Sequence, residues 1–315
     1  MITLAADVGG SRIKLGLVRN EVVLARETLA SLSHEGLAPQ LPRILSAFQI
    51  LCERTGVRPA EQSVISVAFP SVVDPASRRV LTAYGKYVDA PQIDLPHWAK
   101  TTLGLDLVIE NDARVALVGE WRAGAGKGYD DVVIVTLGTG LGTAALMNRR
   151  LVRGKHGQAG ILGGHFTVRH GGRLCTCGNR GCAEAEASTS VLQTIVRERP
   201  EFPDSLLREL DPIDYTGIFR LAREQDACAV AVRAHSIEVW AAMVVNLIHA
   251  YDPELVVVAG GIMAGAGDFF ADLVKEVRTR AHTPWGRVEI VPAQLGDDAA
   301  LIGCDILARE RTLLS

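Results

Sequence analysis

The sequence has no excess of charge of one sign. Its 33 Lys and Arg residues stand against 36 Asp and Glu residues, which gives a formal net charge of −3 over 315 residues. General binding to nucleic acid or to an anionic membrane surface depends on a surplus of positive charge. We therefore expect neither kind of partner.

Long apolar runs are also missing, because no stretch approaches the ~20 residues that span a membrane. The first residues, 1–7, lack the basic segment and the apolar core of a signal peptide. Hydrophobic residues make up 48% and charged residues 22%, which is typical of a folded chain with about two domains. We expect a soluble, cytoplasmic protein.

Two common nucleotide-binding motifs are absent. No Gly-x4-Gly-Lys-Ser/Thr sequence surrounds Lys127, so the chain has no Walker A loop. Gly138, Gly140 and Gly142 lack the Gly-x-Gly-x-x-Gly spacing of a dinucleotide fold, which argues against NAD.

The expected elements alternate as in a mixed α/β protein. Apolar runs that end at turn residues predict strands at 2–8, 13–18, 22–25, 64–69, 107–109, 132–136, 143–147, 255–259 and 288–291. Helical spacing predicts helices at about 41–52, 112–121, 230–250, 269–280 and 297–311. We expect the Gly-, His- and Cys-rich segment 156–184 to be a loop.

Both halves of the sequence open with a strand, a Gly-rich turn and a second strand. The turns are Gly9-Gly10-Ser11 and Gly138-Thr139-Gly140. Glycine lets backbone N–H groups approach a phosphate, and hydroxyl groups add donors, although ordinary hairpin turns look the same. The repeat suggests two α/β lobes related by duplication, with a cleft between them that holds a small molecule.

Two aspartates stand at places suited to chemistry. Asp7 ends the first strand beside its Gly-rich turn, where it could hold a nucleotide-bound Mg²⁺ through water; it could equally cap the turn. Asp112 lies where a strand meets a helix. It could take a proton from a hydroxyl that Asn111 fixes, or it could simply cap the helix.

The six cysteines divide into a cluster and three scattered residues. We expect Cys52, Cys228 and Cys304 to be inert core residues. The others lie in Cys175-Thr176-Cys177-Gly178-Asn179-Arg180-Gly181-Cys182, with His165 ten residues upstream. Three thiolates and one imidazole suit a closed, structural Zn²⁺ site, although His156 or His170 could replace His165, and a redox role is the alternative.

The motifs together closely resemble the ROK family of sugar kinases and sugar-responsive repressors. The resemblance covers almost the whole chain and rests on Asp7-x-Gly9-Gly10-Ser11, Glu110-Asn111-Asp112-Ala113, Leu137-Gly138-Thr139-Gly140-Leu141-Gly142, the cysteine cluster with Glu184, Ala259-Gly260-Gly261 and Leu295-Gly296-Asp297-Asp298-Ala299. It implies an α/β, two-lobed actin-like ATPase (RNase H-like) fold with an interdomain cleft. The smaller N-terminal lobe is expected at 1–117 plus 298–315, and the larger lobe, with the zinc-binding loop, at 118–297.

The resemblance implies ATP- and Mg²⁺-dependent phosphorylation of a hexose or N-acetylhexosamine hydroxyl, usually at C6, by a homodimer or homotetramer. The implied site residues are the base Asp112; the sugar contacts Asn111, Asp112, His165 and Glu184; the ATP and phosphate contacts Asp7, Gly9, Gly10, Ser11, Gly138, Thr139, Gly140, Gly260 and Gly261; and the structural zinc ligands His165, Cys175, Cys177 and Cys182.

The sequence departs from the family in three places. Where the family usually has Gly-Glu-x-Gly-His, the chain has Gly160-Ile161-Leu162-Gly163-Gly164-His165, with no Glu and one more Gly. Gly85 replaces a frequent Asn of the sugar pocket, and Ser71 follows Pro70 where Gly is usual. A site that hydrogen-bonds hydroxyls discriminates strongly by them, so neither glucose nor N-acetylmannosamine is assumed as substrate.

Two other functions compete with a sugar kinase. A repressor of this family carries a DNA-binding domain before the first strand, and because the first strand is expected to begin at Ile2, we do not expect a repressor. A catalytically silent sugar-binding or regulatory protein fits the altered pocket, but the presence of Asp112 argues against it.

Overall fold

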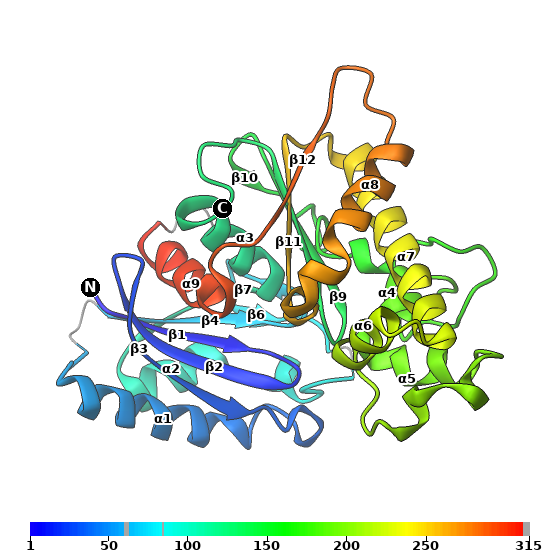
Figure 1. Cartoon of the computed structure of the whole chain (residues 1–315). Helices are drawn as coiled ribbons and strands as arrows, with labels where there is room; N and C mark the ends of the chain where they lie inside the picture. Colours follow the sequence, from blue (N-terminus) through cyan, green and yellow to red (C-terminus); the bar gives the residue numbers. More distant parts are fainter. Residues whose placement is uncertain (60–62, 84, 311–315) are drawn as a thin grey trace. The chain divides into compact units, whose positions relative to one another are not determined.

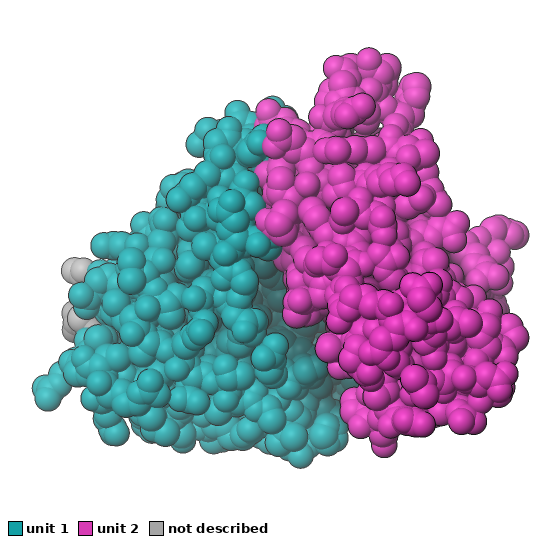
Figure 2. All heavy atoms as spheres, viewed as in Figure 1, with its two compact units in different colours: residues 1–132, 144–161, 293–315 teal, residues 133–143, 162–292 magenta. Residues whose placement is uncertain are grey.

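The structure is a computed structural model that describes residues 1–59, 63–83 and 85–310 (Figure 1). Arg311, at the expected end of the last helix, lies outside the described residues. The chain divides into two compact units, coloured in Figure 2: residues 1–132, 144–161 and 293–315 form unit 1, and residues 133–143 and 162–292 form unit 2. The lobe boundaries expected from the sequence stay a prediction.

Unit 1 is built on a five-stranded sheet with the order β3-β2-β1-β4-β7. Its strands are β1 (Thr3–Val8), β2 (Arg12–Arg19), β3 (Val22–Ala30), β4 (Val64–Phe69) and β7 (Asp106–Asn111). The first three pair as antiparallel hairpins, and β4 and β7 add parallel strands. All six residues of β4 are buried, as expected of a central strand that is covered on both faces.

Helices cover both faces of this sheet (Figure 1). One face packs against α1 (Gln40–Thr55) and α2 (Leu95–Leu103), and the other packs against α3 (Asp112–Ala123) and α9 (Ala299–Arg309). The apolar residues of α1 recur at helical spacing and enter the core, and the helix ends where Gly56 takes a left-handed φ of 67°. The short elements of this unit are η1 (Ser33–Glu35), β5 (Val73–Asp74), β6 (Arg79–Val80), η2 (Ala90–Gln92), β10 (Arg150–Leu151) and η7 (Gly296–Asp298).

The second sheet has the order β10-β9-β8-β11-β12. Its longer strands are β8 (Val132–Leu137), β9 (Leu141–Met147), β11 (Leu255–Ala259) and β12 (Glu289–Pro292). The helical elements of unit 2 are η3 (Gly163–His165), α4 (Ala183–Ala187), α5 (Thr189–Arg197), η4 (Phe202–Asp204), η5 (Leu206–Glu209), α6 (Tyr215–Arg223), α7 (Ala227–Tyr251), η6 (Gly261–Asp268) and α8 (Phe270–Arg280).

The long helix α7 is the central helix of unit 2. It packs against α4, α6 and α8, and its Trp240 is fully buried among the rings of Tyr215 and Phe269. Among the described residues, this helix alone is long and apolar enough to cross a membrane by length and composition, which the inspection of apolar runs did not reveal. Because 61% of its most apolar window is buried inside the protein, its apolar character serves the core.

The expected strands and helices are confirmed, with shifts of a few residues at their ends. The largest difference is at β3, which continues to Ala30; the last helix begins two residues later than expected, at Ala299 after the short turn η7. No bounds are predicted for α2 or for the short helices between 183 and 223, although α5 and α6 have strongly amphipathic sequences.

Two glycines allow α3 and α9 to approach each other closely. A Cβ atom added at Gly119 would lie 2.1 Å from the carbonyl oxygen of Ala299, and one added at Gly303 would lie 2.0 Å from that of Val115. Both distances are far below van der Waals contact, so any side chain at either position would push the helices apart.

We therefore expect Gly119→Ala to lower the free energy of unfolding by about 1–3 kcal/mol, because the added methyl group overpacks the contact between these helices. Gly267→Ala is the matched control, since a Cβ atom there meets nothing within 4 Å. Urea denaturation of the two variants measures the difference. Equal stabilities would contradict the close helix contact.

Candidate active site and metal centre

Asp112 is the first residue of α3, directly after β7. The preceding residue, Asn111, is the N-cap: its side-chain oxygen accepts hydrogen bonds from the backbone N–H groups of Ala113 (3.1 Å) and Arg114 (3.3 Å). An N-cap side chain of this kind satisfies the free donors of the first helical turn. Capping α3 was one of the two roles left open for Asp112. Asn111 is the residue that mainly fills it.

The carboxylate of Asp112 lies in a partly buried and negatively charged environment. One of its oxygens accepts hydrogen bonds from the Ala113 N–H (2.8 Å) and from the Asn111 side-chain amide (3.1 Å). Burial and the nearby Asp7 raise its pKa from 3.8 to about 7, against the opposing effects of the Ala113 N–H and of Lys86. A carboxylate with a pKa near neutrality can both accept and release a proton.

A buried ion cluster fixes the strand end before Asp112. The fully buried Glu110 accepts hydrogen bonds from the Asn111 N–H (2.8 Å), from Arg114 (3.2 Å) and from Arg153 (2.9 Å). Arg114 is itself fully buried and also donates to the carbonyl oxygens of Gly157 and Ala159. The junction between β7 and α3 is therefore rigidly held.

Asp7 lies beside the first Gly-rich turn and shares a lysine with a second carboxylate. Lys14 Nζ lies 3.7 Å from Asp7 Oδ2 and 2.7 Å from Asp297 Oδ1. Burial raises the pKa of Asp7, and Lys14 counteracts part of that rise. Lys14 is directly opposite Asp7 in the β1–β2 pairing, so counting outward from the turn could have identified it.

The turn at Gly9 and Gly10 is held by side chains that bind its carbonyl groups. Tyr87 Oη donates to the Gly9 oxygen (2.9 Å), and the hydroxyls of Ser31 (2.6 Å) and Ser33 (3.0 Å) donate to the Gly10 oxygen. These two carbonyl groups therefore already accept hydrogen bonds from protein side chains. The structure brings Asp7, this turn and Asp112 together in unit 1, with Ser11 exposed at the end of the turn.

The second Gly-rich turn, in unit 2, is clamped by the start of α5. The N–H groups of Thr189 and Ser190 donate to the carbonyl oxygens of Gly138 (3.0 Å) and Thr139 (3.2 Å). Glu184 Oε2 accepts from the Leu141 N–H (3.0 Å). A Cβ atom on Gly140 would lie 2.5 Å from that carboxylate, so a side chain there would displace the end of Glu184.

Gly260 ends β11 against the strand that enters this turn. Its φ is 99°, and a Cβ atom there would lie 2.3 Å from the Leu137 carbonyl oxygen. Gly261 follows as the first residue of η6 and is exposed. Unit 2 therefore gathers the expected turn at 138–140, Glu184 and Gly260 at one end of its sheet strands.

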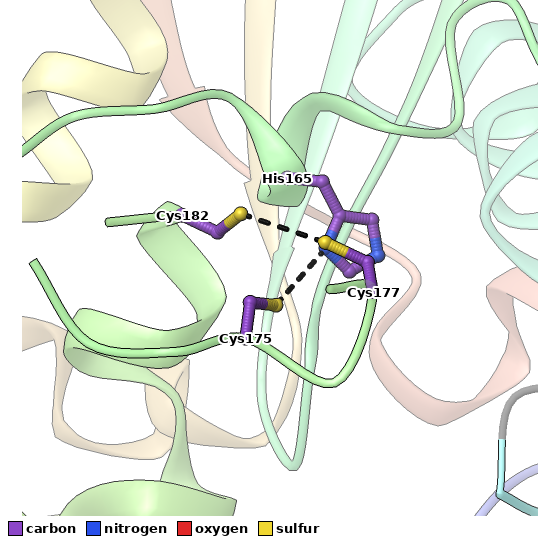
Figure 3. Close-up of side chains that lie close together, drawn as sticks. All are labelled: His165, Cys175, Cys177 and Cys182. Atoms are coloured by element: carbon purple, nitrogen blue, oxygen red, sulfur yellow. Dashed lines mark hydrogen bonds between the residues drawn. The ribbon is translucent and has the colours of Figure 1, made fainter. Parts of the chain in front are cut away.

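His165, Cys175, Cys177 and Cys182 converge in unit 2 (Figure 3). Their ligand atoms all lie within 4.8 Å of one another, with 3.7 Å between the sulfurs of Cys177 and Cys182 and 3.5 Å from Cys175 Sγ to His165 Nδ1. A tetrahedral site with Zn–S of about 2.3 Å and Zn–N of about 2.0–2.1 Å has edges of about 3.8 Å and about 3.6 Å. The residues fit such an ion.

Of the three histidines considered, only His165 lies in this cluster among the described residues. His156 and His170 are exposed, and neither belongs to the cluster found among the described residues. Of the scattered cysteines, Cys228 and Cys304 are fully buried core residues as expected, whereas Cys52 is only half-buried.

The structure explains the additional glycine in the altered segment before His165. Gly163 and Gly164 begin the short helix η3 that carries His165 to the cysteines. A Cβ atom on Gly164 would lie 1.9 Å from the Leu141 carbonyl oxygen, so glycine is required for this close approach.

Two α/β units, each with a glycine-rich turn after its first strand, are the architecture of two-lobed, actin-like sugar kinases. A family model described as "ROK family" matches residues 3–311, and the chain belongs to this family. The protein is 31% identical over 321 residues to a glucokinase of Streptomyces coelicolor, with 98% of each chain covered. The fold matches the crystal structure of a ROK family glucokinase from Streptomyces griseus in complex with glucose and AMPPNP, with a TM-score of 0.80 and 30% identity over 98% of this chain and 100% of that chain.

The family also contains regulators. The chain is 27% identical to a xylose repressor of Bacillus subtilis, over 76% of this chain and 59% of the repressor.

We expect Glu110→Gln to lower the free energy of unfolding by about 3–5 kcal/mol, because it leaves two buried or half-buried arginines without a compensating charge. Glu53→Gln on the exposed face of α1 is the control. Chemical denaturation gives both values. A Glu110→Gln variant as stable as the control would show that the cluster does not hold this junction.

Proposed function

We propose that the chain transfers the terminal phosphoryl group of ATP to a hydroxyl, at C6, of a hexose or hexose derivative, with Asp112 as the general base. Family membership and the glucokinase relatives make it an ATP-dependent sugar kinase. The observation that carries the finer assignment is the carboxylate of Asp112, which burial and Asp7 bring to a pKa of about 7 beside the first Gly-rich turn.

The two turns are proposed to bind the phosphates of ATP. Gly9, Gly10 and Ser11 in unit 1 and Gly138, Thr139 and Gly140 in unit 2 offer backbone N–H groups and hydroxyls, and the carbonyl groups of Gly9, Gly10, Gly138 and Thr139 already accept protein hydrogen bonds. Gly260 and Gly261 are proposed to contact the adenosine. Positioning and charge neutralisation are the main needs of phosphoryl transfer.

Asp7 is the proposed carboxylate for a nucleotide-bound Mg²⁺. Its side chain is partly buried and burial raises its pKa, while Lys14, at 3.7 Å, and Arg12 compensate part of its charge. Hard oxygen ligands and retained water suit Mg²⁺, which when bound would neutralise charge on the phosphates.

His165 and Glu184 are the proposed sugar contacts of unit 2, with Asn111 beside Asp112 in unit 1. Asn111 already caps α3 and donates to Asp112 and to the Ser71 carbonyl oxygen, so it orients the base as well. The cluster of His165 with three cysteines is proposed to hold a structural Zn²⁺. This ion would fix the loop that leads into Glu184 on α4.

The proposed acceptor is a sugar whose contacts with this chain differ from those that glucose makes in the related glucokinases. Ile161 and Leu162 occupy the segment in which the family usually has a glutamate. Assembly as a homodimer or homotetramer stays a prediction.

We expect the purified chain to consume ATP with at least one member of a panel of hexoses, amino sugars and polyols, measured as ADP production. Asp112→Asn removes the base and is expected to lower kcat by about 10²–10⁴-fold. Asp106→Asn, an exposed aspartate at the start of the same strand, is the matched control. The base acts in its ionised form, so activity rises with pH through about 7.

Two results would contradict this function. Wild type and Asp112→Asn equally inactive on every sugar, while a sugar still raises the melting temperature, would indicate a sugar-binding protein without catalysis. A fully active Asp112→Asn variant would show that another group accepts the proton.

We expect about one Zn²⁺ per chain by elemental analysis, and its loss in Cys177→Ser. Cys177 is exposed, so the substitution removes a ligand without opening the core, and Cys52→Ser is the control that keeps all four ligands. A metal-free and fully active preparation of the wild type would refute the zinc site.

A further inference from the structure

Lys86, in the loop after β6, lies directly over the first Gly-rich turn. A Cβ atom added to Gly10 would lie 2.5 Å from Lys86 Nζ, 2.8 Å from its Cε and 3.0 Å from its Cδ. The charged end of this side chain therefore covers the α-carbon of Gly10. Its positive charge also reaches the carboxylate of Asp112.

The backbone next to Lys86 is in a conformation that a bulky residue rarely adopts. Tyr87 has a φ of 51°, in the left-handed region, although its side chain is fully buried. Such outliers persist only where the surrounding structure holds them, and they gather at functional sites.

The contacts that hold this conformation all tie the loop to the turn and its neighbours. The Tyr87 N–H donates to the Ser33 oxygen (2.9 Å), its hydroxyl donates to the Gly9 oxygen, and its ring lies 5.6 Å from that of Phe69. Two residues further on, Asp89 accepts hydrogen bonds from the N–H groups of Leu37 (2.5 Å) and Ala38 (2.9 Å). The loop is thus anchored at Tyr87 itself and two residues beyond it, and Lys86 projects from it over Gly10.

The charges around the turn distinguish Lys86 from the other lysine nearby. Lys14 is engaged by the carboxylates of Asp7 and Asp297. Among the residues that the structure describes, Lys86 has no carboxylate within 4.0 Å of its ammonium group. A half-buried cation that is held over a phosphate-binding turn without an ion-pair partner is suited to an anionic ligand.

We propose that Lys86 is a catalytic residue that contacts the phosphoryl group of ATP while it is transferred. This inference rests on the proposed function. In the reaction, the sugar hydroxyl oxygen forms a bond to the γ-phosphorus and its proton passes to Asp112. The bond between the γ-phosphorus and the bridging oxygen breaks, and ADP leaves with the electron pair. Lys86 neutralises charge on the oxygens of the phosphoryl group, which such a transition state requires.

The test compares Lys86→Met, which keeps most of the side-chain length without its charge, with Lys86→Arg and with the control Lys100→Met. Lys100 is an exposed residue of α2 that forms a surface ion pair with Asp106. We expect Lys86→Met to lower kcat by about 10²–10³-fold with an unchanged KM for the sugar. Lys86→Arg recovers part of the loss, and Lys100→Met has no effect. Thermal denaturation verifies that the variants are folded.

A second measurement uses binding alone. Because Lys86 contacts the terminal phosphate, calorimetry is expected to show that the wild type prefers AMPPNP to ADP and that Lys86→Met loses this preference while its affinity for ADP is retained. The pH at which activity rises also moves upward in Lys86→Met. The groups that act on Asp112 are Asp7 of β1, Lys86, and the local amides of Asn111 and Ala113, while Lys14 is paired with Asp7, so removal of Lys86 takes away the cation that lowers the pKa of Asp112.

The outcomes separate this proposal from the proposed function. An active wild type whose kcat is unchanged in Lys86→Met overturns the role of Lys86 but leaves the kinase standing. A rise of the sugar KM alone, with the preference for AMPPNP intact, places Lys86 at the sugar and also overturns it. A wild type that phosphorylates no sugar contradicts the proposed function, and the preference for AMPPNP over ADP still decides the role of Lys86. A wild type that does not prefer AMPPNP to ADP overturns the proposed role of Lys86.

Discussion

The side chain of Asn111 makes the contacts on which the proposed chemistry of unit 1 depends. Its oxygen accepts hydrogen bonds from the N–H groups of Ala113 and Arg114 at the start of α3. Capping of the helix therefore does not occupy both carboxylate oxygens of Asp112. Asp112 is then presented at the first turn of a helix whose entry is locked by the buried Glu110 and its two arginines. The proposed role of Asp112 as a base requires this rigidity, because a small displacement of a base lowers the rate strongly.

The electrostatic balance around this acid follows from the same arrangement. Two carboxylates, Asp7 and Asp112, lie close enough to raise the proton affinity of Asp112, and two lysines reduce the repulsion from different sides. Lys14 is fixed by the β1–β2 register, whereas Lys86 is fixed by a strained loop. Since like charges in a partly buried site are unfavourable, the fold tolerates this cluster only with such cations or with a bound cation in place.

In unit 2, hydrogen bonds likewise connect segments that are far apart in the sequence, namely the second Gly-rich turn and the helices α4 and α5. Glu184 accepts a hydrogen bond from the strand that leaves the second Gly-rich turn, and α5 clamps the carbonyl groups of that turn. The cysteine cluster lies directly before α4, which carries Glu184. A metal ion at the cluster would therefore stabilise the loop at one end while the turn holds it at the other.

The sequence by itself determined the α/β character, most strands and long helices, and the three cysteines of the candidate metal cluster, because apolar periodicity and ligand spacing are local properties. It also indicated Asp7, Asp112 and both turns. It left open whether Asp112 or its neighbour caps α3, and which histidine joins the cysteines, since both depend on how side chains meet in space. Lys86 and Tyr87 carried no signal at all. Only the tertiary structure placed them, because a loop position over a distant turn is set by packing and hydrogen bonds between segments nearly eighty residues apart in the chain.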